Sequence, residues 1–465
     1  MHIVIDLLIV AFYLISLLLI GIYTRSRKSG FKAFASVKGK DYTHSKLILV
    51  ATIFASTIGG GTTFGISEKV FATNVAHSYG LFLAIPIDIL IAKYIIPRLI
   101  KHYGIETVGD LMFSYYGKIG RTIGGLATLF VSIGLVAAQI SVSARIFEYI
   151  LQIDYIKGVI ISYGIIIIYT TVGGFRSILF TNQIQFFAIL IAIPIISIFG
   201  LYQIGISEFI QKIPSEKITI LGNDDMIKTT ISAFLGFAVM NMLPTFIQRA
   251  LIDKDSSQTT KAIYLKSVLY AIFLIFITIN GLIAFVLYPE IKPSLALPYL
   301  IDHIIPVGLQ GIVIVGLLAA VMSTADSDLN ITSITLLKDF FQPIFNLSNQ
   351  KNMLIIARIT NIIVGSLAIL IALRFNSIVD LVIFIAGFWG PIILVPLIFG
   401  LYDVTIPKFA MVFTSFSGGA TFLSWEYFMT ATYSLKSVFV GTLVSFIVFI
   451  IFVILKRFSS YNPTK

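Results

Sequence analysis

The sequence predicts an all-α, polytopic membrane protein with about 13 transmembrane helices, and two observations carry that prediction. Of the 465 residues, 57% are hydrophobic and only 12% are charged, whereas soluble domains carry about 25% charged residues. Apolar runs of about 20 residues, long enough to cross about 30 Å of hydrocarbon, recur from one end of the chain to the other. Lipid is therefore the solvent expected for most of the surface.

Thirteen apolar runs are expected to span the membrane. The first is too long for a signal peptide and lacks a small-residue cleavage site, so we expect a retained helix. No soluble domain fits between the runs, and 1–465 is expected to be a single transmembrane domain. The expected spans are 4–24, 46–66, 79–97, 122–149, 157–174, 178–202, 229–247, 265–288, 307–336, 354–373, 377–402, 408–428 and 436–455.

The charges between the spans predict the orientation. With the loop that begins at Thr24 placed in the cytoplasm, 23 Lys and Arg lie on the cytoplasmic side and 8 on the opposite side. The positive-inside rule then puts the N-terminus outside and the C-terminus inside a plasma membrane. High Ile and Lys usage suggests that this is a bacterial inner membrane. The same rule accounts for the net charge of +11, so no nucleic acid partner is expected. The absence of cysteine excludes disulfides, thiolate metal sites and cysteine nucleophiles.

Three consecutive glycines, Gly59 to Gly61, interrupt the second span within the stretch STIGGGTTFG. Each glycine weakens a helix by about 1 kcal/mol relative to alanine, and polar backbone at membrane depth is tolerated where it lines a cavity or packs against protein. Close helix packing is the alternative explanation, because small residues dominate membrane helix interfaces. The flanking hydroxyls favour an unwound segment with exposed carbonyl oxygens.

A second polar stretch, Gly316 to Ser333, holds Ser323, Thr324, Asp326 and Ser327 within about one helical turn. A carboxylate among hydroxyls, without His or Cys, offers hard oxygen ligands that suit an alkali ion better than a transition metal. Too few carboxylates converge for a typical Ca²⁺ cage, so Na⁺ is the natural ligand. The alternative is a helix end that leaves the membrane, with its two aspartates solvated.

Two further stretches contain breaks. In the first, Gly173-Gly174 followed by Arg176 predicts a tight cytoplasmic turn, and Asn182 lies just inside the next span. In the second, Pro244 breaks the seventh span beside Asn241. Spans two and seven, both interrupted, are five apart. This fits a five-plus-five inverted repeat preceded by one extra helix, an arrangement in which transporters place their site between the broken helices.

At these stretches the chain resembles the sodium:solute symporter family, whose members share the LeuT-type inverted-repeat fold. The resemblance covers roughly residues 1–455, and its motifs occur in family order. It implies an extra helix at 4–24, repeats at 46–202 and 229–402, and two accessory helices at 408–455. The matching segments are ETVGDLMFSYYGK (Glu106–Lys118), GGFRSILFTNQIQ (Gly173–Gln185), FIQRALIDKD and AAVMSTADS (Ala319–Ser327).

The resemblance implies a sodium site and, in some members, a second one. The first would use the carbonyl oxygens of Ala55, Ile58 and Ala320 and the hydroxyls of Ser323 and Thr324. The second matches Ser323, Asp326 and Ser327. Its usual aspartate partner is replaced here by Asn182, although Asp326 could supply the missing charge from the opposite helix.

The resemblance is less informative about the residues that bind the substrate. The glycine stretch and AAVMSTADS look most like the choline-transporter branch. That branch has Trp where this chain has Thr57, and quaternary ammonium recognition normally needs an aromatic cage. Choline is therefore not the expected solute. The expected cavity residues are Thr57, Gly61, Thr62, Gln139, Asn241 and Trp389.

The leading hypothesis is sodium-coupled secondary active symport of a small polar organic solute, with Na⁺ as coupling ion and no organic cofactor. A transporter-like sensor without net transport and a proton-coupled symporter using Asp326 are the alternatives. An enzyme is not expected, because no HExxH motif and no Ser–His pairing occurs in the spans. The expected surroundings are membrane lipid, with the protein a monomer or weak homodimer.

Overall fold

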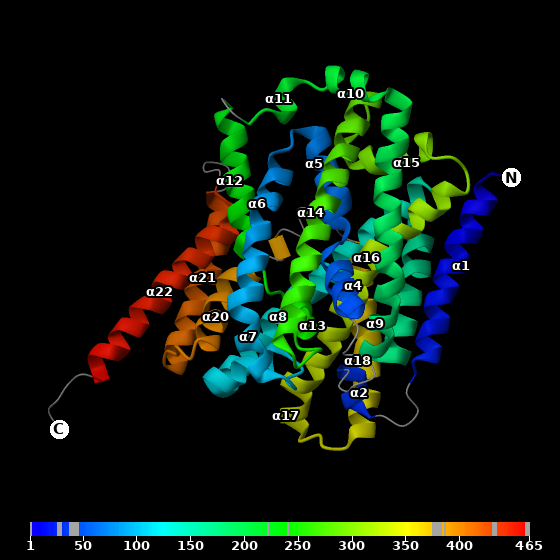
Figure 1. The fold of residues 1–465 in the computed structure, drawn as a ribbon. Helices are drawn as coiled ribbons and strands as arrows, with labels where there is room; N and C mark the ends of the chain where they lie inside the picture. Colours follow the sequence, from blue (N-terminus) through cyan, green and yellow to red (C-terminus); the bar gives the residue numbers. More distant parts are fainter. Residues whose placement is uncertain are drawn as a thin grey trace.

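The computed structural model describes residues 2–25, 30–36, 46–220, 223–239, 241–373, 384–385, 387–429 and 435–460. Within this part the regular elements are helices, which run mostly between the two ends of one elongated bundle (Figure 1). Eight of them are long and apolar enough to cross a membrane, and a ninth span is formed by a bent pair. The fold is therefore an all-α membrane bundle, while the number of 13 spans stays a prediction.

The first half of the chain begins with α1, which lies at one edge of the bundle, and ends with the short helices α10 and α11 at the upper end of Figure 1. The elements are α1 (His2–Tyr23), α2 (Phe31–Ala35), α4 (Lys46–Thr57), η1 (Gly61–Gly65), α5 (Ile66–Ala72), α6 (Ala76–Leu90), η2 (Ile91–Ile95), α7 (Ile96–Leu99), η3 (Ile100–His102), α8 (Val108–Tyr149), α9 (Tyr155–Ile204), α10 (Ile206–Lys212) and α11 (Ser215–Ile218).

The second half begins with a broken span and ends with α21 and α22, at the edge opposite α1 (Figure 1). The first part of the predicted span 377–402 lies outside the described residues. The elements are α12 (Asp224–Val239), α13 (Pro244–Ala250), α14 (Ser256–Leu287), η4 (Pro293–Leu295), α15 (Ala296–Ile304), α16 (Leu309–Thr335), η5 (Leu336–Phe341), α17 (Gln342–Phe345), α18 (Gln350–Ala372), η6 (Gly390–Leu394), α20 (Val395–Leu401), α21 (Lys408–Phe428) and α22 (Ser437–Ser460).

Glycines with positive φ divide the two longest helices. In α9 the break is at Gly174, with φ +61°, as expected for a turn between the predicted spans 157–174 and 178–202. A side chain there would also collide with α2, since an added Cβ would lie 2.6 Å from Phe34 Cδ2. In α8 the break at Gly117, with φ +64°, separates a short first segment from the membrane span. Glycine tolerates this left-handed backbone without steric cost.

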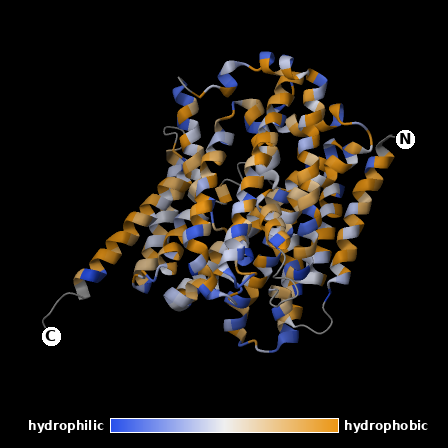
Figure 2. Ribbon diagram, viewed as in Figure 1, coloured by the Kyte–Doolittle hydropathy of each residue, from blue (hydrophilic) through white to orange (hydrophobic). Residues whose placement is uncertain are grey.

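The centre of the bundle is α16, which packs against α8 and α9 and is buried along almost its whole length. The extra helix α1 is anchored to it by one carboxylate. Asp6 accepts hydrogen bonds from the backbone N–H groups of Gly308 (2.9 Å) and Gly311 (2.6 Å) at the N-terminus of α16. Anions are favoured at that end of a helix. The other face of α1 is apolar and exposed, as at Phe12 (77% exposed), and Figure 2 shows hydrophobic residues along the outer helices.

Candidate functional site

The helix formed by α4 breaks where the glycines predicted it would. Residues Ile58 and Gly59 are not helical, and the segments Lys46–Thr57 and Gly61–Ala72 are bent by 61°. Gly59 N–H donates to Thr62 Oγ1 (3.0 Å), and Gly60 N–H donates to Gln139 Oε1 on α8 (2.8 Å). In a continuous helix these two groups would donate to the carbonyls four residues earlier. The break therefore turns backbone oxygen atoms away from the helix ladder.

Two neighbouring hydroxyls of α16 meet the released carbonyls. Ser323 Oγ lies 2.8 Å from Ala55 O and 3.0 Å from Ala320 O. Thr324 Oγ1 lies 3.1 Å from Ile58 O and 3.3 Å from Ala320 O. The structure thus brings together all five residues expected for the first sodium site. Their five oxygens are uncharged and hard, a donor set suited to an alkali ion.

The residues expected for a second sodium site surround an arginine instead. Arg249 of α13 is fully buried, donates to Ser327 Oγ, and donates through Nε to Thr52 Oγ1 (3.1 Å). Thr52 Oγ1 also accepts from Asn182 Nδ2 (2.9 Å). Asp326 Oδ2 accepts from the Tyr169 hydroxyl (2.7 Å). A guanidinium thus already provides positive charge here, and sequence analysis, which assigned Arg249 to a cytoplasmic loop, missed it.

The alternative that Asp326 and Asp328 are solvated at a helix end is wrong. Asp326 is 0% exposed and Asp328 is 1% exposed, because α16 continues in the core well beyond them. Asp328 Oδ1 accepts a hydrogen bond from Ser132 Oγ on α8 (2.8 Å). Both carboxylates therefore belong to the interior of the bundle.

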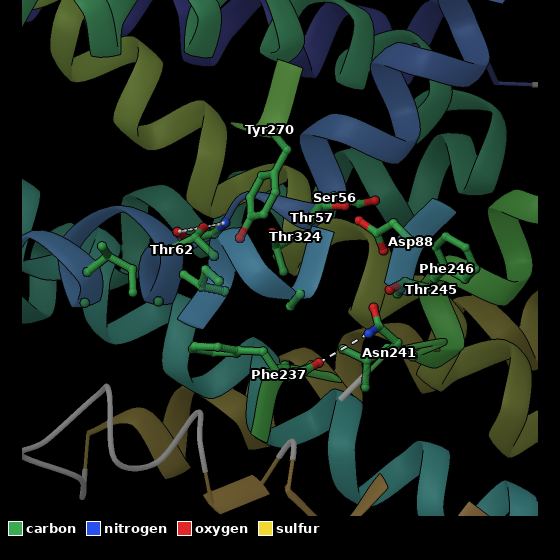
Figure 3. A pocket seen from close by; sticks show the side chains of 18 of the residues that line it. Ser56, Thr57, Thr62, Asp88, Phe237, Asn241, Thr245, Phe246, Tyr270 and Thr324 are labelled. Atoms are coloured by element: carbon green, nitrogen blue, oxygen red, sulfur yellow. Dashed lines mark hydrogen bonds between the residues drawn. The ribbon is translucent and has the colours of Figure 1, made fainter. Parts of the chain in front are cut away.

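A cavity of about 270 Å³ opens beside the break in α4, and the side chains labelled in Figure 3 surround it. Five of the six expected cavity residues line it: Thr57, Gly61, Thr62, Gln139 and Asn241. Further polar lining residues include Ser56, Asp88, Thr245, Lys266, Tyr270, Thr324 and Asp328. Thr324 both lines this cavity and provides one of the five oxygens of the expected sodium site, so the cavity adjoins that site directly.

Trp389 is not among the described residues that line this cavity, so its expected role is not supported. Its ring is 0% exposed. The following residues, Gly390 and Pro391, begin a π-helical turn instead of continuing the α-helix. The position of a tryptophan in a span does not reveal which side of the helix it occupies, and here the side chain is part of the core.

Known proteins resemble this chain in sequence and in fold. The model of the sodium:solute symporter family matches residues 44–406. The chain belongs to the sodium:solute symporter family. The sodium/pantothenate symporter of Escherichia coli K12 is 25% identical over 381 residues, 77% of this chain and 77% of that protein. The sodium/sialic acid symporter NanT of Aliivibrio fischeri is 22% identical over 382 residues, 77% of this chain and 74% of that one.

A solved structure agrees on the fold. A Na⁺-coupled sialic acid symporter in a substrate-bound outward-open state superposes with a TM-score of 0.82 at 20% identity, covering 97% of this chain and 98% of that chain. The fold is thus the LeuT-type inverted repeat expected from the sequence. The protein is a sodium-coupled symporter of a small solute, not an enzyme, and a multi-pass protein of the plasma membrane.

The symporter's cavity also contains a buried ion pair that sequence analysis missed. Lys266 Nζ on α14 lies 2.7 Å from Asp88 Oδ2 on α6, with the two side chains 4% and 12% exposed. Lys266 lies at the start of the expected span 265–288 and Asp88 lies within the expected span 79–97, but neither was expected to line the cavity. The place of Asp328 in the cavity lining could have been predicted from the sequence. It follows Thr324 by four residues and therefore shares its helix face.

Proposed function

We propose that this symporter carries one Na⁺ on the five oxygens of Ala55, Ile58, Ala320, Ser323 and Thr324, together with a small polar solute in the adjoining cavity. The observation that carries the proposal is the meeting of Ser323 Oγ with Ala55 O and of Thr324 Oγ1 with Ile58 O. Both hydroxyls can rotate their protons away and present lone pairs to a cation. Na⁺ would then replace hydroxyl–carbonyl hydrogen bonds that cross from α16 to the broken helix.

This geometry supports coupling by alternating access. Na⁺ bridges α16 and the end of α4, and so holds the break in the shape that the solute contacts. The solute binds beside the break, against Thr57 at the end of α4, Gln139 of α8 and Asn241 in the break between α12 and α13. Each Na⁺ that moves inward contributes about 2.3 kcal/mol per 100 mV of membrane potential, in addition to its concentration gradient. Loss of Na⁺ to the cytoplasm releases the constraint on the break and with it the solute.

The buried charges favour a single Na⁺. Asp326, Asp328 and Arg249 lie within this region, and Arg249 acts electrostatically on both carboxylates. With these three groups ionised, their sum is one negative charge, while Asp88 and Lys266 neutralise each other. Uncompensated buried charge is strongly unfavourable. One monovalent cation brings the region to neutrality, so no second Na⁺ is needed at Ser327 and Asn182.

The same proposal includes the orientation and organisation expected from the sequence. Arg249 and Lys266 are buried, and removing both from the cytoplasmic count leaves the excess of basic residues there intact. The N-terminus is then outside and the C-terminus inside a bacterial inner membrane. The repeats are 46–202 and 229–402, and the functional unit is a monomer or weak homodimer in lipid.

Two measurements test the proposal. Thermal unfolding of the purified protein, with amino acids, sugars, carboxylates and quaternary amines screened in Na⁺ and in K⁺, should identify a solute that stabilises only with Na⁺, because a bound ligand raises stability by mass action. Proteoliposomes should then accumulate that solute only under an inward Na⁺ gradient. Equal uptake with a K⁺ gradient, or with a pH gradient alone, would refute sodium coupling at these oxygens.

A further inference from the structure

One charged side chain of the transport cavity, Lys69 of α5, forms no ion pair within the described part of the chain. The other charged residues that line the cavity are compensated. Asp88 and Lys266 neutralise each other, and Asp328 belongs to the buried group whose net negative charge the proposed Na⁺ offsets. With Na⁺ bound, the cavity therefore keeps one positive charge that lacks a counter-charge.

Lys69 lies on the face of α5 that borders the cavity, at the end of that face farthest from the break at Gly59. It follows Ile66 by three residues and Gly65 by four, and all three residues line the cavity. Long side chains in a helix lean back toward its N-terminus, which here is the side of the break. The ammonium group of Lys69 therefore extends back toward the place where the solute is proposed to bind.

A buried nitrogen close to Lys69 also lacks a partner. His77, at the start of α6, lines the same cavity, and Lys69 acts on it electrostatically. The Nδ1 atom of His77 is buried and has no hydrogen-bond partner among the described residues. A neutral imidazole that carries its proton on this atom is a hydrogen-bond donor, and an unpartnered buried donor is unfavourable. An acceptor that arrives with the solute would satisfy it.

We propose that the solute is a small organic monocarboxylate, with its carboxylate between Lys69 and His77 and its body against the break. This inference rests on the proposed function and names its substrate class. The lysine supplies a charge-assisted hydrogen bond and the imidazole a second one. Between these groups and Asp88 the cavity face of α6 is apolar, at Leu81 and Ile85, so the body of the solute is partly apolar. The volume of about 270 Å³ is close to the smallest small-molecule pockets, about 300 Å³.

The charge balance separates a monocarboxylate from its nearest alternatives. A zwitterion such as an amino acid adds no net charge and leaves Lys69 uncompensated when the cavity closes, and a dicarboxylate adds one negative charge too many. A monocarboxylate and one Na⁺ also form an electrically neutral cargo. The effects of the membrane potential on the two charges then cancel, and the Na⁺ concentration gradient alone drives uptake.

Binding is tested with matched probes on the purified full-length protein. Linear monocarboxylates from acetate to octanoate are each compared with their primary amide, and valerate also with δ-aminovalerate and glutarate, by thermal unfolding in Na⁺ and in K⁺. At least one monocarboxylate should stabilise the protein in Na⁺, and its uncharged, zwitterionic and dianionic counterparts should not. A panel without a stabilising monocarboxylate overturns the proposal. Stabilisation by an amide or a zwitterion only in Na⁺ overturns the carboxylate and leaves the sodium site intact, whereas equal stabilisation by a monocarboxylate in Na⁺ and K⁺ supports the carboxylate and contradicts the sodium site.

Substitution of the lysine tests where the carboxylate binds. Lys69→Met should weaken binding of the stabilising monocarboxylate by about tenfold or more, and Lys69→Arg, which keeps the charge, should bind it nearly as wild type does. The matched control is Lys157→Met, which removes an exposed lysine of α9 that is not among the described residues lining the cavity. Unchanged binding in Lys69→Met, or an equal loss in Lys157→Met, would overturn the role of Lys69.

The wild-type protein decides the question even if Lys69→Met does not fold. Proteoliposomes that contain K⁺ and valinomycin should take up the monocarboxylate at the same rate with and without an inside-negative potential, at a fixed Na⁺ gradient. Faster uptake at a Hill coefficient for Na⁺ near 1 would overturn the anionic solute. Faster uptake at a coefficient near 2 would instead overturn the single Na⁺ of the proposed function.

Discussion

Ser323 Oγ of α16 lies 2.8 Å from the carbonyl oxygen of Ala55, 268 positions earlier in the chain, at the point where α4 stops being a helix. This contact joins a continuous helix, buried along almost its whole length, to a broken one. In the proposed sodium site a cation can be bound and released because neither partner is an ionised group. A carboxylate at the same place would hold Na⁺ more tightly and release it less readily.

Removing the hydroxyl of Ser323 or Thr324 should weaken the affinity for Na⁺. Ser323→Ala and Thr324→Ala should each raise the Na⁺ concentration for half-maximal uptake by about tenfold, since a lost coordinating oxygen costs on the order of 1–3 kcal/mol. The measurement is solute uptake into proteoliposomes at varied external Na⁺. Thr324→Ser keeps the oxygen and should remain close to wild type. An unchanged Na⁺ dependence in both alanine variants would remove these hydroxyls from the site.

Gly60, at the break after α4, should not tolerate a side chain. A Cβ on Gly60 would lie 2.4 Å from Val142 Cγ2 and 3.0 Å from Val142 Cβ, and overpacking of this kind costs about 1–3 kcal/mol. Gly60→Ala should therefore lower thermal stability and abolish most uptake, and the added Val142→Ala should restore part of both. Gly164→Ala is the matched control, because its Cβ would meet nothing within 4 Å. Failure of Val142→Ala to rescue would mean that Gly60 is needed for a reason other than space.

The break and the turn at Gly174 could be predicted from sequence because each depends on local residue types, whereas the meeting of the α16 hydroxyls with the broken helix was implied by the family resemblance. A run of glycines unwinds a membrane helix, and helix residues three or four positions apart share a face. The buried charges could not be predicted in this way. Lys266 and Arg249 stand next to polar loop residues in the sequence, and only their partners on distant helices, Asp88 and Ser327, show that they face inward. Trp389 was expected to line the cavity but is part of the core. Nothing in the neighbouring sequence indicates which side of its helix faces the cavity.

The Asp88–Lys266 pair should tolerate joint removal better than single removal. Breaking a buried pair leaves an unpaired charge and costs about 3–5 kcal/mol, whereas replacing both members with neutral groups is often nearly neutral. Lys266→Met and Asp88→Asn should therefore each lower the unfolding temperature strongly, and Asp88→Asn/Lys266→Met should recover most of the loss. Because both residues line the cavity, the stable double variant should still show altered solute preference in a competition assay. Additive losses in the double variant would mean that the two residues act separately.

Restoring a carboxylate at position 182 should change the sodium stoichiometry. Asn182 Nδ2 lies 2.9 Å from Thr52 Oγ1, close to Arg249 and Ser327. Asn182→Asp adds a second net negative charge to the region, which a second Na⁺ can neutralise. The Hill coefficient for Na⁺ in uptake should rise from about 1 toward about 2. Asn182→Ala removes the amide without adding charge and should leave the Hill coefficient near 1. A wild-type coefficient near two would instead overturn the single-sodium proposal.

Lys217 should give the folded protein a pH-dependent stability in the alkaline range. Its Nζ donates to Phe71 O (2.6 Å) and Thr73 O (3.0 Å) at the end of α5, and burial lowers the pKa of Lys217 below its ordinary value of 10.5. Between the lowered pKa and 10.5 the unfolded state binds more protons than the folded state, so stability attributable to this group rises with pH.

Lys217→Met tests this relationship because it removes both the titration and the hydrogen bonds. At neutral pH the variant should unfold at a lower temperature, since the end of α5 loses donors for its carbonyl groups, each worth about 1 kcal/mol. Its stability should also change less than that of wild type as the pH rises toward 10.5. Lys212→Met, which removes an exposed lysine paired with Glu208 on α10, should alter neither property. If wild type and Lys217→Met follow parallel stability curves over this range, Lys217 does not titrate there, and the cap on α5 acts only through its hydrogen bonds.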